Sequence, residues 1–148
     1  MKGFPDLPPI WLVLFLVLNW AVSQLVPGFP VGLYTTSLSW ALIGIGLALI
    51  LWAAFWFWRR KTTIEPHHAP GVLIKEGPFR ISRNPIYLAM VIILMGAIFG
   101  RGQPISLILL PVFVYILTRR FVIPEEAALR TAFGSDADAY LAQTRRWI

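Results

Sequence analysis

The chain has 148 residues, of which 57% are hydrophobic and 14% charged, and its formal net charge is +6. Soluble domains usually carry about 25% charged residues, so this composition indicates a protein that lies in lipid. The absence of Cys excludes disulfides, thiolate metal ligands and a cysteine nucleophile. The positive charge does not predict nucleic-acid binding, because its distribution follows the membrane topology described below.

Four long apolar runs predict an all-α integral membrane protein, since about 20 residues cross the hydrocarbon core. The expected spans cover residues 7–26, 38–58, 85–99 and 104–123. The third span is short, so we expect it to be tilted or tightly paired with the fourth in a hairpin. Residues 1–148 would then form one membrane domain, with a cytosolic loop over 59–84 and short interfacial helices over 124–148.

The basic residues predict the orientation of the chain in the membrane. If both termini are cytoplasmic, 12 of the 13 Lys and Arg residues lie on that side and only Arg101 lies outside. This is the positive-inside pattern of an inner or cytoplasmic membrane protein. A cleaved signal peptide is not expected, because Lys2 is offset by Asp6 and no small-residue cleavage site follows.

The second span carries local signals at both ends and in its middle. Thr35, Thr36 and Ser37 can cap its start, and Gly44 and Gly46 permit close approach of another helix. Its far end is rich in Trp and Phe and is followed directly by three basic residues. This order is typical of a cytoplasmic membrane interface.

The following loop contains Glu65, His67 and His68, which at first resemble a metal site. Adjacent histidines do not face one another on any regular element, and Glu65 is the only acid nearby. We therefore expect no metal here, and favour a loop on the membrane surface in which a histidine touches a polar ligand.

The stretch from Gly77 to Tyr87 begins the third span. Asn84 is expected to cap the helix with its side chain, and Pro85 suits the first helical position. Arg80 and Arg83 lie beside the positive end of this helix, an arrangement that favours anions. The alternative is a basic loop that only sets topology.

A second charged cluster follows the fourth span. Pro124 is expected to begin a separate surface helix, with Glu125 and Glu126 in its first turn, and Gly134 should end it. A last short helix carries Tyr140, and the end of the chain, which includes Arg146, should anchor at the interface.

If the last two spans pair, the arginines and glutamates of these two clusters become neighbours. Cations, carboxylates, aromatic rings and free helix N–H groups would then line a pocket that opens to lipid. Such a pocket suits a zwitterionic or nucleotide-like ligand and a reaction whose chemistry belongs to the cofactor. The alternative is a set of salt bridges between helix ends.

These motifs resemble those of a known family. Gly77-Pro78-Phe79-Arg80, Ser82-Arg83-Asn84-Pro85-Ile86-Tyr87, Pro124-Glu125-Glu126, Phe133-Gly134, Tyr140 and Arg146-Trp147 are similar to the isoprenylcysteine carboxyl methyltransferase family, which is related to the phospholipid methyltransferases. The resemblance covers roughly residues 62–148 and includes the order and spacing of the motifs.

The resemblance implies a membrane methyltransferase that uses S-adenosyl-L-methionine. The substrate would be lipophilic or membrane-resident, with an isoprenylcysteine-like carboxylate or a lipid headgroup as acceptor. Glu125, Arg120 and Arg83 would take part in catalysis. The cofactor would be held by Val72, Leu73, Ile74, Phe79, Arg83, Asn84, Pro85, Tyr87, Glu125 and Glu126.

Three positions depart from the family pattern. Asn84 replaces a common histidine, Arg120 lies one position from the expected substrate arginine, and Ala137 replaces a motif tyrosine. Two other functions stay open, an NADPH-dependent membrane reductase of the sterol-reductase type and a non-catalytic membrane scaffold. The partners expected are the bilayer and a lipophilic small molecule, without nucleic acid or metal.

Overall fold

The computed structural model describes residues 6–61 and 72–148, which form helices and no strand. The predicted Glu65, His67 and His68 loop lies outside the described residues. The α-helices are α1 (Pro8–Leu25), α2 (Leu33–Arg59), α3 (Pro85–Arg101), α4 (Leu109–Leu117), α5 (Ile123–Phe133) and α6 (Ser135–Gln143). Short 3-10 turns lie at Gly77–Arg80 and Pro104–Ile108, and a π turn at Thr118–Val122 joins α4 to α5.

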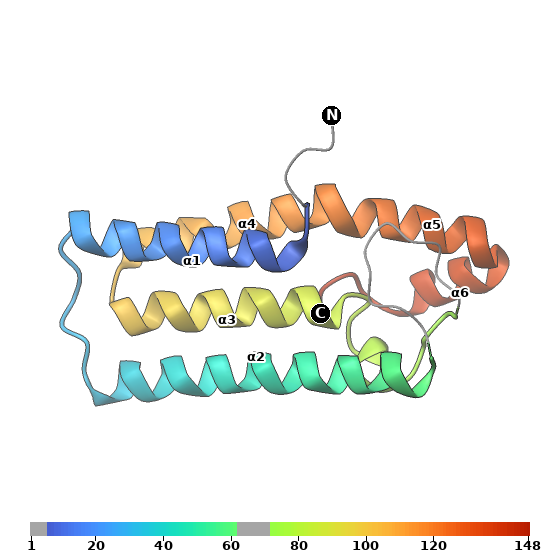
Figure 1. The fold of residues 1–148 in the computed structure, drawn as a ribbon, viewed down its shortest axis with the longest axis horizontal. Coiled ribbons are helices and arrows are strands. Elements are labelled where there is room, and N and C mark those ends of the chain that lie inside the picture. Colours follow the sequence, from blue (N-terminus) through green and yellow to red (C-terminus); the bar gives the residue numbers. More distant parts are fainter. Residues whose placement is uncertain (1–5, 62–71) are drawn as a thin grey trace.

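Helix α3 lies in the middle of the bundle (Figure 1). It packs against α2 on one side and against α1 and α4 on the other. The main core is formed by buried side chains of α1, α3, α4 and the π turn, among them Phe15, Leu94, Phe113 and Phe121. Helices α5 and α6 continue beyond this core at one end, and the C-terminus returns to the start of α3 (Figure 1).

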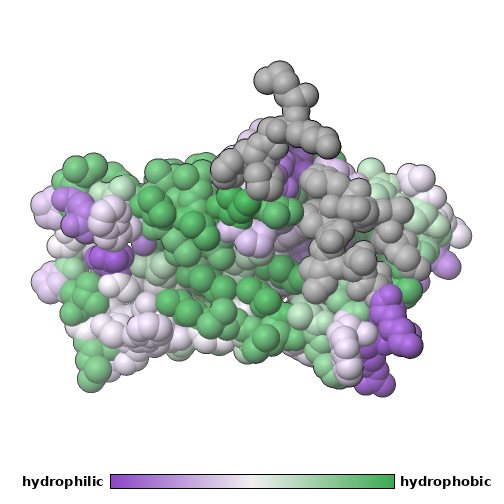
Figure 2. Space-filling view, in the orientation of Figure 1, coloured by the Kyte–Doolittle hydropathy of each residue, from purple (hydrophilic) through white to green (hydrophobic). Residues whose placement is uncertain are grey.

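Within residues 6–61 and 72–148, three helices are long and apolar enough to cross a membrane: α1, α2 and a continuous helix over Pro104–Phe133. Helix α3 is also apolar, but it has 17 residues. Figure 2 shows a mainly apolar surface over the middle of the bundle. Exposed large side chains such as Trp40, Ile45 and Leu51 of α2 contribute to this apolar surface, which is suited to contact with lipid.

The predicted break between the fourth span and a separate surface helix is wrong. The helix does not stop before Pro124 but continues to Phe133, and the residues around the junction have helical backbone angles. Proline lacks an N–H, and its ring crowds the carbonyl four residues earlier. The helix passes this point through a π turn, in which the Ile123 N–H bonds to the Thr118 carbonyl five residues earlier, and this wider turn precedes the proline ring.

The start of α2 also differs from the prediction. The helix begins at Leu33, five residues before the expected span, and its N-cap residue Gly32 makes no side-chain cap. The hydroxyls of Thr35 and Thr36 instead donate back to the Gly32 carbonyl, at 2.9 and 3.0 Å. Threonine inside the first turn bonds its own helix in this way.

Close contact between α2 and α3 depends on one of the two predicted glycines. A Cβ on Gly46 would lie 2.5 Å from Cγ1 of Ile93 and 2.9 Å from the Ala89 carbonyl oxygen of α3. A Cβ on Gly44 would meet no atom within 4 Å. The packing prediction is therefore confirmed for Gly46 and wrong for Gly44.

Candidate functional site

The 3-10 turn at Gly77–Arg80 is held between α2 and α6. Gly77 has a φ of +60°, and a Cβ there would overlap the indole of Trp56 on α2. The ring of buried Phe79 meets Phe57 edge to face, with ring centroids 5.5 Å apart. The Tyr140 hydroxyl of α6 donates to the Phe79 carbonyl at 2.9 Å, and burial raises the pKa of Tyr140 to about 12. The turn is thus fixed from both sides.

The segment predicted to pack on a cofactor is only partly free. Ile74 is buried against Ala53 and Phe79, whereas Leu73 is half-buried and Val72 exposed. Val72 and Leu73 therefore remain available to a ligand, while Ile74 is part of the buried cluster with Ala53 and Phe79.

The start of α3 is tied to the C-terminal segment. The Arg83 N–H donates to the Arg145 carbonyl at 3.0 Å, and the Asn84 side chain donates to the Arg146 carbonyl at 3.1 Å. Pro85 is buried at the first position of the helix. The predicted side-chain cap by Asn84 is wrong, because its amide is turned to the C-terminal segment and makes no cap bond. The helix start is held from outside the helix.

Glu126 lies between two arginines. It is 5% exposed and accepts hydrogen bonds from Arg83 Nη1 at 2.8 Å and from Arg146 Nη2 at 2.7 Å and Nε at 2.9 Å. The hydrogen bonds to Glu126 raise the pKa of Arg146. Arg83 also donates to the carbonyls of Leu141 and Thr144. The predicted proximity of the two charged clusters is confirmed for Arg83 and Glu126.

Glu125, the neighbouring glutamate, has a different partner. Its Oε1 accepts a hydrogen bond from the Tyr87 hydroxyl of α3. The Tyr87 ring belongs to the main core and lies 6.1 Å, centroid to centroid, from the ring of Phe121. Among the residues that the structure describes, Glu125 has no ion pair. Its charge is therefore not balanced by a cation there.

Arg120 lies apart from the Arg83–Glu126–Arg146 cluster. Its Nε is 3.4 Å from the Asp6 carboxylate, and its guanidinium lies 5.2 Å from the ring centre of Trp11. Trp11 also donates to Asp6 at 2.8 Å. The structure thus joins the predicted catalytic residue Arg120 to the N-terminal end of α1, whereas Arg83, Glu125 and Glu126 lie at the start of α3.

Three residues outside the predicted site prove central to this geometry: Trp56, Tyr140 and Arg146. Trp56 belongs to the aromatic end of α2, which the sequence predicts to lie at the membrane interface, and its indole packs on Gly77. At the end of the chain, which is expected to anchor at the membrane interface, Trp147 packs against the main core. The sequence does offer one signal, since Tyr140 and Arg146 belong to the motifs that carried the family resemblance.

The fold and the site define a class of protein: a helical membrane protein with a charged, partly buried site where α3 and α5 meet the C-terminal segment. The phospholipid methyltransferase family model matches residues 34–136, which include Tyr87, Glu125 and Glu126. The chain belongs to this family, and its members are methyltransferases. Searches of curated proteins and of solved structures found no match.

Proposed function

We propose that the protein transfers a methyl group from S-adenosyl-L-methionine to a lipophilic or membrane-resident small molecule. The acceptor would be an isoprenylcysteine-like carboxylate or a lipid headgroup. The observation that carries this proposal is the pair formed by Tyr87 and Glu125, because Glu125 has a hydrogen-bond donor but no described cation. A carboxylate without a cationic partner suits a positively charged ligand. Glu126 does not, because it is already paired with Arg83 and Arg146.

The residues present fit this cofactor. Its sulfonium and ammonium groups are cations that a partly buried carboxylate attracts, and its adenosine suits an apolar surface such as Val72 and Leu73. When bound, S-adenosylmethionine supplies an electrophilic methyl group. The protein then has to orient the reactants and exclude water, which is mainly a matter of positioning.

The residues around Glu125 contribute to this positioning in different ways. Tyr87 orients the Glu125 carboxylate through its hydroxyl, while its ring is held in the core. Arg83, Glu126 and Arg146 hold the C-terminal segment against the start of α3. Phe79 and Ile74 form a buried apolar wall on the α2 side. A carboxylate acceptor needs no general base, whereas an amine needs a proton acceptor, for which Glu125 is the candidate.

The proposal includes a topology. Helix α3, about 26 Å long at 1.5 Å per residue, would also cross the membrane, which gives four spans in all, and both termini would be cytoplasmic. The site would then open to the cytoplasm for the cofactor and to the bilayer for the acceptor.

Calorimetric titration of S-adenosylmethionine tests the proposal. Glu125→Gln removes the charge and keeps the shape, and a hydrogen bond to a charged group contributes about 1.5–3 kcal/mol. We therefore expect the affinity to fall roughly tenfold to a hundredfold. Asp138→Asn is the matched control, because Asp138 is an exposed acid paired with Arg130, and it should bind as the unmodified protein does.

A second variant separates orientation from charge. Tyr87→Phe keeps the buried ring and removes the hydroxyl, so we expect weaker binding than in the unmodified protein but tighter binding than in Glu125→Gln. Normal cofactor affinity in a folded Glu125→Gln protein would show that Glu125 is not in the site. Binding of NADPH without binding of S-adenosylmethionine would replace the proposal by a reductase.

A further inference from the structure

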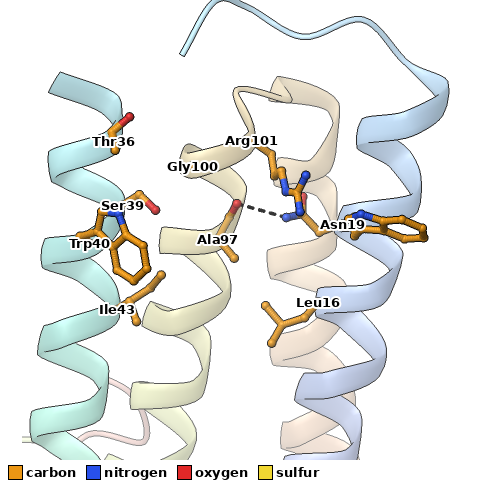
Figure 3. Close-up of a pocket in the computed structure, with 10 residues that line it drawn as sticks. Leu16, Asn19, Thr36, Ser39, Trp40, Ile43, Ala97, Gly100 and Arg101 are labelled. Carbon is orange, nitrogen blue, oxygen red and sulfur yellow. Dashed lines mark hydrogen bonds between the residues drawn. The ribbon is translucent and has the colours of Figure 1, made fainter. Parts of the chain in front are cut away.

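A cavity lies at the end of the bundle away from Tyr87 and Glu125. It has a volume of about 410 Å³ and is lined by α1, α2 and α3 (Figure 3). Arg101 lies 14 residues after Tyr87 on α3, which corresponds to about 20 Å along the helix. The cavity is therefore separate from the proposed methyl-transfer site. Its volume falls in the range of about 300–1,000 Å³ that is usual for small-molecule sites.

Asn19 is the unusual residue of this cavity. The residue is 3% exposed, and its Nδ2 donates to the Ala97 carbonyl at 3.2 Å. Its Oδ1 is buried without a hydrogen-bond partner among the described residues. Gln103 Oε1 and Ser106 Oγ are also buried without a partner in the described part of the chain, but these two residues do not line the cavity. A buried acceptor without a donor costs about 1–3 kcal/mol, which a ligand with an N–H or O–H group would recover.

The rest of the lining changes from polar to apolar along the bundle axis. Figure 3 shows Thr36 and Arg101 toward the end of the bundle, and Ile43 and Leu16 deeper. Arg101 is exposed and has no carboxylate partner among the described residues. Trp20 and Trp40 add two exposed indoles to the rim of the cavity, and such rings are common at headgroup level. The lining thus matches an amphiphile with an anionic polar end and an apolar tail.

We propose that this cavity binds a phospholipid whose headgroup carries both a phosphate and a hydrogen-bond donor. The phosphate would pair with Arg101, the donor would reach Asn19 Oδ1, and the first carbons of the acyl chains would lie along Leu16 and Ile43. The lipid is bound and not methylated there, because Tyr87 and Glu125 lie at the other end of α3.

Native mass spectrometry of the full chain with added lipid tests this assignment. Three lipids with the same acyl chains separate the contributions: phosphatidylglycerol has an anionic phosphate and hydroxyl donors, phosphatidylmethanol has the anion without a donor, and phosphatidylcholine has neither a net charge nor a donor. We expect phosphatidylglycerol to bind about tenfold more tightly than phosphatidylmethanol, the gain typical of one hydrogen bond to a buried group. Phosphatidylcholine should bind most weakly.

Two variants assign the effects to residues. Arg101→Gln should weaken phosphatidylglycerol and phosphatidylmethanol alike, by about tenfold. Asn19→Leu should abolish the preference for phosphatidylglycerol without weakening phosphatidylmethanol. Arg119→Gln removes an exposed arginine from the π turn at the other end of the bundle and should change neither. Far-UV circular dichroism checks that each variant keeps its helices.

Four results would overturn the proposal. The first is equal binding of phosphatidylglycerol and phosphatidylmethanol by the unmodified protein. The second is an equal loss in Arg101→Gln and Arg119→Gln. The third is displacement of the lipid by its soluble head, glycerophosphoglycerol, at the same concentration, since the site would then take a free phosphodiester. The fourth is a lipid-free dimer that Arg101→Gln dissociates, since a second copy of the chain would then fill the cavity.

Discussion

Two adjacent glutamates with the same local sequence signals have opposite surroundings. Glu126 is buried between Arg83 and Arg146, whereas Glu125 turns to the Tyr87 hydroxyl. A buried carboxylate with two guanidinium partners has a structural role, since it holds the C-terminal segment. A carboxylate without a described cation is the one that can bind a charged ligand. The two residues should therefore respond differently to the same substitution.

Glu126→Gln should destabilise the protein by about 3 kcal/mol, because it leaves buried arginine charge without its carboxylate. Breaking a buried ion pair usually costs about 3–5 kcal/mol. We expect the lower value because the Arg146 side chain is 39% exposed. The measurement is thermal unfolding in detergent, followed by circular dichroism. Asp138→Asn, in the exposed pair with Arg130, should change stability by less than about 1 kcal/mol. Similar losses in the two variants would contradict a structural role for the cluster.

Tyr140 gives a prediction for alkaline pH. Burial raises its pKa in the folded protein from 10.0 to about 12, so the unfolded chain loses this proton first. Its contribution to stability is complete below pH 10 and is lost as the pH rises through about 12. Tyr140→Phe also removes the hydrogen bond to the Phe79 carbonyl. Unfolding at pH 9 and pH 11.5 should show a smaller loss in Tyr140→Phe than in the unmodified protein; equal losses would place the alkaline transition elsewhere.

At the scale of elements, the contact between α2 and α3 depends on position rather than on composition. Gly44 and Gly46 are equivalent in sequence, but they lie on different faces of α2. Only Gly46 faces the α3 backbone closely enough to exclude a side chain. The pair provides a matched test of this contact.

Gly46→Ala should destabilise the bundle by about 1–3 kcal/mol, because an added methyl group must displace Ile93 or move the helices apart. Gly44→Ala meets no atom within 4 Å and should be neutral or slightly stabilising. Unfolding of both variants in the same detergent provides the comparison. A neutral Gly46→Ala would mean that α2 and α3 can separate at no cost.

The junction at Pro124 shows how an element boundary can mislead. Proline followed by two acids is typical of a helix start, and the residues after Pro124 are indeed helical. The chain nevertheless continues as one helix through a π turn. The continuation carries Glu125 and Glu126 on the same rigid helix as the core residues Phe113 and Phe121. The site is therefore anchored directly to the bundle.

For the whole molecule, the proposed orientation can be tested directly because the chain has no native cysteine. Val31 and Ser135 are exposed; Val31 lies in the connection between α1 and α2, and Ser135 begins α6. These two segments lie at opposite ends of the bundle (Figure 1). Cysteines introduced there should react with a membrane-impermeant maleimide from opposite sides of the membrane, Ser135→Cys from the cytoplasmic side. Reaction of both from the same side would overturn the proposed topology.

The sequence by itself predicted the features that depend on local composition. Long apolar runs predict lipid-facing helices wherever they occur, and Gly134, with its positive φ, ends α5 as expected. The sequence also predicted that basic and acidic clusters would meet, because pairing the last helices leaves them at one end. These inferences need only neighbouring residues and the length of a membrane span.

Only the tertiary structure decided which residues of those clusters meet. Arg83 and Glu126 are 43 positions apart, and Arg83 and Thr144 are 61 apart. Such partners depend on how each helix is rotated about its axis, and hydropathy does not define this rotation to within one residue. For that reason only the folded chain shows three of the contacts at the site. These are the hydrogen bond from Tyr87 to Glu125, the hydrogen bond from Asn84 to the C-terminal segment and the ion pair of Arg120 with Asp6.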